Sequence, residues 1–229
     1  MMNRDREFNP QLFWASIIGI CLVIIMGSVF VTRSYMKRMR YEAEHPRLPF
    51  MSKLEKDLKG VNRDGKDIHL AQLKGKIWVA GYLYTDCPSA CLGLAAYMAD
   101  LNKVYGEQDD FQLVSISLNP KGDTPEKMDA FVKKNGVDAD NWWFLSGDEE
   151  EIRKYMLRYF KLYSVKENTD AADIAANGKF SHDQRLVLVD RGGNIRGYYR
   201  VMDPQRGMQE LARLKADIQR LFDGVDEMK

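Results

Sequence analysis

The chain has 229 residues, with 34 Lys and Arg against 33 Asp and Glu, which gives a formal net charge of +1. Hydrophobic residues make up 45% and charged residues 29%, a composition typical of a packed globular protein and not of a disordered chain. The balanced charge gives no reason to expect a nucleic-acid partner. Three cysteines are too few for a disulfide scaffold or a four-thiolate metal site.

An uncharged apolar run at residues 12–32 is long enough to cross a hydrocarbon core of about 30 Å as a helix. It predicts a retained transmembrane anchor, because a signal peptide normally has an apolar region of about 7 to 15 residues and a small-x-small cleavage site. More basic residues follow the run than precede it, which by itself favours a cytoplasmic domain. Cys21 lies within the run, where we interpret it as a small apolar residue in lipid.

The sequence predicts five segments. A short tail at 1–11 precedes the transmembrane helix at 12–32, and a basic juxtamembrane segment with a polar connector follows at 33–49. One domain fills residues 50–225, because no further linker, repeat or low-complexity stretch interrupts it. A tail at 226–229 ends the chain.

Strand and helix patterns alternate through this domain. An Asp-Gly turn signal at 61–66 predicts a hairpin, and apolar runs predict strands at 77–84, 111–118, 142–145, 185–190 and 195–200. Helical periodicity and capping signals predict helices ending at Gly106 and near Gly136, and helices at 146–160 and 208–222. Residues 165–179 read as a loop that carries at most one short helix. This order predicts a thioredoxin-like α/β fold, a mixed central sheet flanked by helices with an N-terminal hairpin extension.

Cys87 and Cys91 lie between the strand at 77–84 and the helix that follows it. If the helix begins within the motif, the two side chains share one face, and their sulfurs can form a disulfide or hold one ion. The positive end of the helix dipole is expected to lower their thiol pKa values below about 8.5. Thioredoxins have two residues between their cysteines, whereas this motif has three.

His182 follows the polar loop and precedes a strand, where it can be presented to the cysteine edge of the sheet. Two thiolates and an imidazole suit Cu(I) and can hold Cu(II) with an added oxygen ligand, whereas structural zinc normally has four protein ligands. His45 and His69 have weaker claims to a site. The 12 methionines, Met36 and Met39 among them, are interpreted as packing residues or membrane contacts.

The chain resembles the SCO/SenC family of copper-delivery proteins over residues 48–222. The resemblance rests on three ordered segments, DGKDIHLAQLKGKIWVAGYLYTDCPSAC, VSISLNPKGDTPEKMDAFVKKNGVDADNWWFLSGDEEEIRKY and SHDQRLVLVDRGGNIRGYY. It implies that Cys87 and Cys91 are thiolate ligands and a redox pair, and that His182 is the third copper ligand. It also implies a domain on the periplasmic or intermembrane-space side, against the charge bias around the anchor.

Two positions depart from the family pattern. The family usually has Pro after the second cysteine, where this chain has Leu92, and commonly has Asp before the histidine, where this chain has Ser181. Asp183 follows His182 instead, either as a residue that orients the imidazole or as an ordinary residue at the start of a strand. These departures bear on copper affinity and redox potential.

Three hypotheses remain open at the level of sequence. The first is a metallochaperone that passes copper to the copper-accepting subunit of a terminal oxidase, cytochrome c oxidase, by ligand exchange at a shallow, exposed site. The second is a membrane-anchored thiol-disulfide oxidoreductase that reduces partner cysteines, draws on a thiol reductant and needs the cysteines but not His182. The third is a copper or redox sensor that acts on a membrane partner.

Overall fold

The computed structural model describes residues 10–44, 47–87 and 90–224. It divides into two compact units, with the boundary between Arg47 and Leu48. The predicted tail at 226–229, most of the tail at 1–11, and His45 lie outside the described residues. Each unit is described by itself below.

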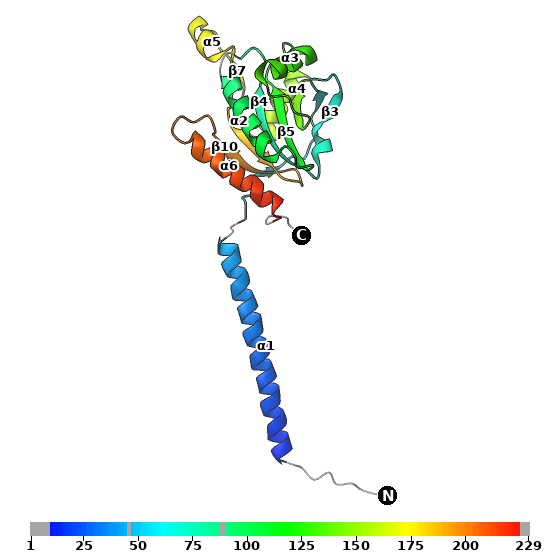
Figure 1. The fold of residues 1–229 in the computed structure, drawn as a ribbon, viewed down its shortest axis with the longest axis vertical. Helices are drawn as coiled ribbons and strands as arrows, with labels where there is room; N and C mark the ends of the chain where they lie inside the picture. The colour runs from blue at the N-terminus through cyan, green and yellow to red at the C-terminus, as the bar shows by residue number, and fades with distance from the viewer. Residues whose placement is uncertain (1–9, 45–46, 88–89, 225–229) are drawn as a thin grey trace. The chain divides into compact units, whose positions relative to one another are not determined.

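The first unit is the helix α1, Pro10–Glu44, which contains the predicted transmembrane segment (Figure 1). Within the described ranges it is the one helix long and apolar enough to cross a membrane, with a mean hydropathy of 2.5 over an 18-residue window of the span Pro10–Arg40. Cys21 is exposed on it. The helix continues into the expected connector, because the Met, Lys, Arg and Glu residues there are strong helix formers.

The second unit is built on a six-stranded sheet of order β1-β10-β9-β4-β5-β6. Its strands are β1 Ser52–Lys53, β4 Ile77–Leu83, β5 Phe111–Ser117, β6 Trp142–Leu145, β9 Leu186–Val189 and β10 Asn194–Tyr199. β4, β5 and β6 run parallel, whereas β9, β10 and β1 are joined to the sheet by antiparallel pairing. The sheet is therefore mixed, as the sequence predicts.

Two short ladders and six further helical segments complete the domain. The ladders pair β2 Lys59–Val61 with β3 Asp67–His69, and β7 Lys166–Glu167 with β8 Phe180–Ser181. The helices are the 3-10 turn Leu70–Leu73, α2 Ala90–Tyr105, α3 Pro125–Asn135, α4 Glu149–Arg158, α5 Ala171–Asn177 and α6 Gly207–Phe222. Thr124 caps α3, and Gly136 ends it in the left-handed region at φ 63°.

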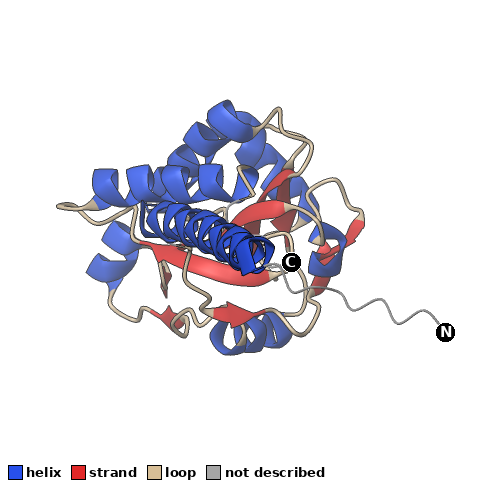
Figure 2. Ribbon diagram, turned by 90° about the horizontal axis from the view of Figure 1, so that it is seen from below, coloured by secondary structure: helices blue, strands red, loops and turns tan. Residues whose placement is uncertain are grey.

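Helices cover both faces of the sheet (Figure 2). Residues of β4 alternate between the faces, so that Gly81 lies against Leu94 of α2, whereas the ring of Trp78 packs edge-on against Phe160, just beyond α4. On the first face α6 lies beside α2, where Tyr105 Oη donates to a backbone carbonyl of α6 at 2.9 Å (Figure 1). Every residue of β4 and β5 is buried, as expected for central strands covered on both sides.

The predicted thioredoxin-like fold is confirmed. Three features escaped the sequence analysis, namely β1, the 3-10 turn and the β7–β8 ladder. Each has only two to four residues, too short for hydrophobic periodicity to mark it. The β7–β8 ladder matters for the site, because it ends one residue before His182.

Candidate functional site

The segment that leads from β4 to the cysteines is held by a buried carboxylate. Asp123, 1% exposed, accepts hydrogen bonds from Thr85 through its backbone N at 2.9 Å and its Oγ1 at 2.7 Å. Its other oxygen accepts a hydrogen bond from Ser117 Oγ at the end of β5. Asp123 therefore ties the entrance of the cysteine motif to the neighbouring strand. Asp123 directly precedes Thr124, the residue that caps α3.

Replacing Asp123 with alanine is expected to lower the free energy of unfolding by about 3 kcal/mol, because three buried donors would lose a charged acceptor. The Asp123→Asn variant keeps an oxygen for Thr85 and should lose about 1 kcal/mol or less. Urea denaturation of both variants measures the difference. Equal losses in the two variants would contradict the assigned network.

Both cysteines lie at the head of α2 as thiols and not as halves of a disulfide. Cys87 is 6% exposed and Cys91 is 0% exposed. The backbone N–H of Cys91 donates to Cys87 Sγ at 3.1 Å. Because α2 begins at Ala90, this N–H is one of the amides that a helix start leaves without an intrahelical partner. The helix start thus contacts the Cys87 sulfur, as the motif's place in the sequence suggested.

The expected lowering of the thiol pKa is wrong for Cys91. Its hydrogen bond to the Cys87 sulfur and its burial both raise the pKa of the Cys91 thiol, and the negative charge of Asp123 adds to this. The contact with Cys87 and the loss of hydration together outweigh the effect of the helix start on the Cys91 pKa. Cys91 is therefore a neutral thiol at neutral pH, and a metal ion must displace its proton in order to bind.

The structure brings His182 to the thiols. His182 Nε2 lies 4.0 Å from Cys91 Sγ, and Nδ1 lies 2.8 Å from the carbonyl oxygen of Asp183. Because a carbonyl only accepts hydrogen bonds, Nδ1 carries the proton and Nε2 presents its lone pair to Cys91. Burial lowers the pKa of His182, although the bond to the carbonyl opposes this, so the neutral ring is favoured. Its ring packs edge-on against Tyr82 and Tyr84.

The Asp183 carboxylate anchors the segment after His182 and does not contact the imidazole. It accepts a hydrogen bond from Tyr163 N at 3.0 Å and pairs with Arg185, whose Nη2 lies 2.6 Å away. The Arg185 guanidinium lies over the rings of Tyr163 and Tyr198, 4.9 and 4.8 Å from their centroids. Of the two roles considered for Asp183, the structure supports orientation of the imidazole, through the backbone carbonyl of Asp183 and not through its carboxylate.

The donor atoms of Cys87, Cys91 and His182 must move slightly closer together to hold one soft cation. Within the described part of the chain, no three His, Cys, Asp or Glu side chains converge closely enough to hold a metal ion. Cys91 Sγ and His182 Nε2 are nevertheless 4.0 Å apart. This distance is close to the sum of a zinc–thiolate bond and a zinc–imidazole bond, which are about 2.3 and 2.0 Å long. Cys87 Sγ, which lies 3.1 Å from the Cys91 amide nitrogen, completes the donor set.

Two cavities adjoin the site. A groove of 510 Å³ between α2 and α3 is lined by Cys87, by Leu92, which is 38% exposed, and by Phe131. A second cavity, of 350 Å³, is lined by His182 and the segments around Arg185 and Met202. The shallow, exposed site expected from the sequence is therefore wrong in its depth, since both thiols are buried and Cys91 lines neither cavity.

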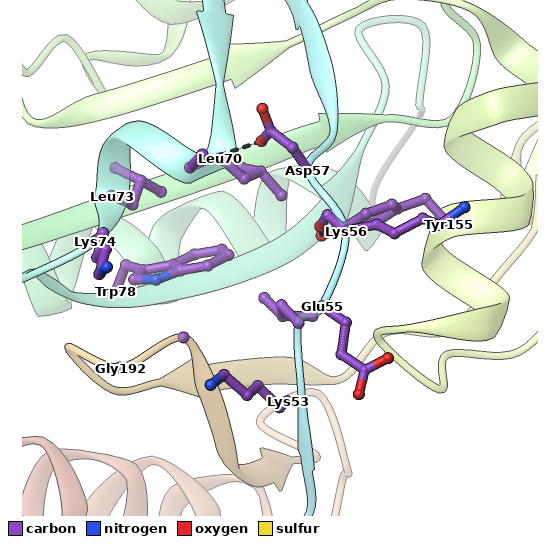
Figure 3. Close-up of a pocket in the computed structure, with 13 residues that line it drawn as sticks. Lys53, Glu55, Lys56, Asp57, Leu70, Leu73, Lys74, Trp78, Tyr155 and Gly192 are labelled. Atoms are coloured by element: carbon purple, nitrogen blue, oxygen red, sulfur yellow. Dashed lines mark hydrogen bonds between the residues drawn. The ribbon is translucent and has the colours of Figure 1, made fainter.

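A third cavity, of 330 Å³, lies at the opposite end of the sheet (Figure 3). It is lined by Trp78 near the start of β4, Tyr155 of α4 and Gly192 beyond β9. Neither of the site cysteines nor His182 lines it. His69 Nδ1 pairs at 3.0 Å with Asp57, another residue of this lining. The structure thus does not bring His69 to the thiols.

The domain is thioredoxin-like, with a mixed sheet flanked by helices. Its thiol–imidazole site consists of a Cys-x-x-x-Cys motif at the start of a helix and a histidine that faces it. Residues 47–216 match the SCO1/SenC family. The chain therefore belongs to the SCO1/SenC family, as its resemblance in sequence suggested.

Individual relatives agree with this assignment. The chain is 36% identical over 136 residues to the SCO1 protein homolog of Bacillus subtilis, covering 58% of this chain and 67% of the relative. A SCO1/SenC family lipoprotein of Bacillus anthracis superposes with a TM-score of 0.62 at 30% identity, over 77% of this chain and 98% of that one. BsSco, described as a cytochrome c oxidase assembly protein with a disulfide switch, superposes with a TM-score of 0.61 at 26% identity, over 76% and 97%.

Proposed function

We propose that this protein is a copper metallochaperone that binds copper through Cys87, Cys91 and His182 and delivers it to the copper centre of a terminal oxidase during assembly. The observation that carries the proposal is the neutral imidazole of His182, whose Nε2 faces Cys91 at 4.0 Å. Membership of the SCO1/SenC family supports it, and the description of BsSco as an oxidase assembly protein supports the acceptor. Cu(I) is the favoured cargo, because two sulfurs and an imidazole form a soft donor set.

The three donors contribute differently to loading and release. Each thiol gives up a proton when it becomes a ligand, so loading releases protons to solvent. His182 is neutral with or without copper, because its bond to the Asp183 carbonyl keeps the proton on Nδ1. His182 can therefore leave the metal without taking up a proton, which suits it to be the first ligand that an acceptor replaces.

The groove beside Cys87 supports docking of an acceptor at the thiols. Leu92 and Phe131 give it apolar walls, and Lys127, Lys134 and Asp86 also line it, which leaves an excess of one positive charge. An acceptor segment that presents an apolar side chain with acidic neighbours matches this lining in shape and charge. Leu92 stands where the family usually has Pro, so this wall differs from the common pattern.

The test compares Cu(I) affinity of the reduced full chain in detergent with that of its His182→Ala variant, by competition with a chromophoric Cu(I) chelator. We expect at least a tenfold loss of affinity, about 1.4 kcal/mol, in His182→Ala. His69→Ala serves as the matched control and should bind as the unchanged chain does. Equal affinity in His182→Ala and in the unchanged chain would remove His182 from the ligand set.

A thiol-disulfide oxidoreductase is the second candidate, favoured by the contact between the Cys91 amide and Cys87 Sγ. In that reaction a Cys87 thiolate attacks a partner disulfide, a mixed disulfide forms, and Cys91 displaces the partner as a dithiol while Cys87 and Cys91 are oxidised. The same titration separates the two candidates. A chain that binds no copper above background, but reduces a partner-derived peptide disulfide equally well with His182→Ala, would be a reductase.

We further propose that α1 anchors the domain on the extracytoplasmic side of the membrane. The apolar span Pro10–Arg40 and the lipoprotein relative of Bacillus anthracis support anchoring, and the proposed oxidase acceptor supports the side. Protease added to spheroplasts should degrade the domain at residues 48–224. Protection from protease until the membrane is lysed would place the domain on the cytoplasmic side.

A further inference from the structure

The cavity beside His182 contains a sulfur that the proposed ligand set does not use. It is lined by the segment around His182 and by the loop that joins β10 to α6. Among the described residues that line it, Met202 alone carries sulfur. The charges around it balance, with Arg185 and Arg200 opposed by Asp183 and Asp203, so the cavity carries no net charge that would repel a cation.

Met202 is held against the helix that carries Cys91. A Cβ on Gly93 would lie 2.7 Å from Met202 Cε and 3.2 Å from its Sδ, so the thioether fills the space that a side chain at residue 93 would need. Gly93 lies two residues after Cys91 in α2. The thioether therefore lies beside the turn that bears one thiol and lines the same cavity as His182.

A thioether in this place has chemistry that suits Cu(I). It is a soft donor, and unlike a thiol it needs no deprotonation to bind a metal ion. The Met202 sulfur can therefore bind Cu(I) through a lone pair in the cavity that it shares with His182.

We propose that Met202 Sδ is a further donor to Cu(I), which it binds together with His182 in the cavity that both residues line. This rests on the proposed copper function and adds a ligand that the Cys-x-x-x-Cys and histidine pattern does not contain. Cu(I) keeps its oxidation state when it moves between these donors, and the only bonds made and broken are those to its ligands.

The test is X-ray absorption at the copper edge of the reduced full chain, produced with selenomethionine, loaded with one equivalent of Cu(I) in detergent. We expect a copper–selenium scattering path at bonding distance in the unchanged chain. Met202→Leu, which nearly conserves side-chain volume, should lose this path. Met208→Leu, at a methionine of α6 that is 74% exposed, is the matched control and should keep it.

The outcomes separate this inference from the proposed function. Copper bound without a selenium neighbour, or with one that survives in Met202→Leu, would overturn the role of Met202 and leave the chaperone proposal standing. Failure of the unchanged chain to bind copper would overturn both. If Met202→Leu does not fold, the spectrum of the unchanged chain still shows whether any methionine binds the ion. Gly93→Ala then takes the place of Met202→Leu, because its new methyl group displaces the Met202 thioether and should remove the copper–selenium path.

Discussion

Serine at both Cys87 and Cys91 should lower Cu(I) affinity at least about a thousandfold, roughly 4 kcal/mol. The hydroxyl of serine is a hard donor that stays protonated at neutral pH, so the variant offers Cu(I) only the imidazole of His182 and the thioether. The fold should survive, because each replacement nearly conserves side-chain volume. The measurement is the same chelator competition, performed on the reduced full chain in detergent.

Cys21→Ser is the matched control for this prediction. Cys21 is exposed on α1, in the unit that precedes the domain, and its replacement should leave the affinity unchanged. Affinity that survives in the double variant, or that falls equally in Cys21→Ser, would show that the copper measured is not held by the motif. The proposed ligand set would then be wrong.

Asp183→Ala should lower the free energy of unfolding by about 3 to 5 kcal/mol, the range measured when one partner of a buried ion pair is removed. The Asp183 side chain is almost fully buried, and its loss leaves the Arg185 guanidinium between two aromatic rings without its carboxylate. Tyr163 N loses its acceptor as well. Because this network holds the segment that begins at His182, Cu(I) affinity should fall in the same variant.

An exposed ion pair supplies the comparison for Asp183. Lys154 and Glu150 form an i,i+4 pair on α4, and both side chains are largely exposed. Lys154→Ala should leave the free energy of unfolding nearly unchanged, because solvent screens an exposed ion pair. Urea denaturation of the two variants side by side measures the difference. If Asp183→Ala lowers the free energy of unfolding no more than Lys154→Ala does, the buried network does not stabilise the fold.

The strand, loop and helix around the cysteines were predictable from local sequence. The continuous apolar runs of β4 and β5 mark central strands, and the periodicity after Cys91 marks α2. The approach of His182 to Cys91 was predictable only in part from the pattern of residues, because 91 positions separate them and the pairing of β9 with β4 brings the two segments together. The place of His182 before a strand allowed the contact, and the family resemblance strengthened that expectation.

The pKa of Cys91 and the role of Asp123 depend on how deeply each side chain is buried. Hydrophobic periodicity in the sequence does not predict burial in a loop. The pKa of Cys91 is raised because the thiol is fully covered and bonded to Cys87, whereas sequence position suggested the opposite. The role of Asp123 as acceptor for Thr85 likewise depends on burial, which its place beside the start of α3 does not show. The local signal for that role was a pair of hydroxyl-bearing residues, Thr85 just beyond the end of β4 and Ser117 at the end of β5.

The copper content of the full chain in its reduced and oxidised forms tests the central claim most directly. The chain is purified in detergent, divided, treated either with a reductant or with an oxidant that joins Cys87 to Cys91, and titrated with Cu(I) in the absence of oxygen. We predict one tightly bound copper per reduced chain and none in the oxidised chain. No copper in the reduced chain, or equal copper in both, would contradict a site built on these two thiols.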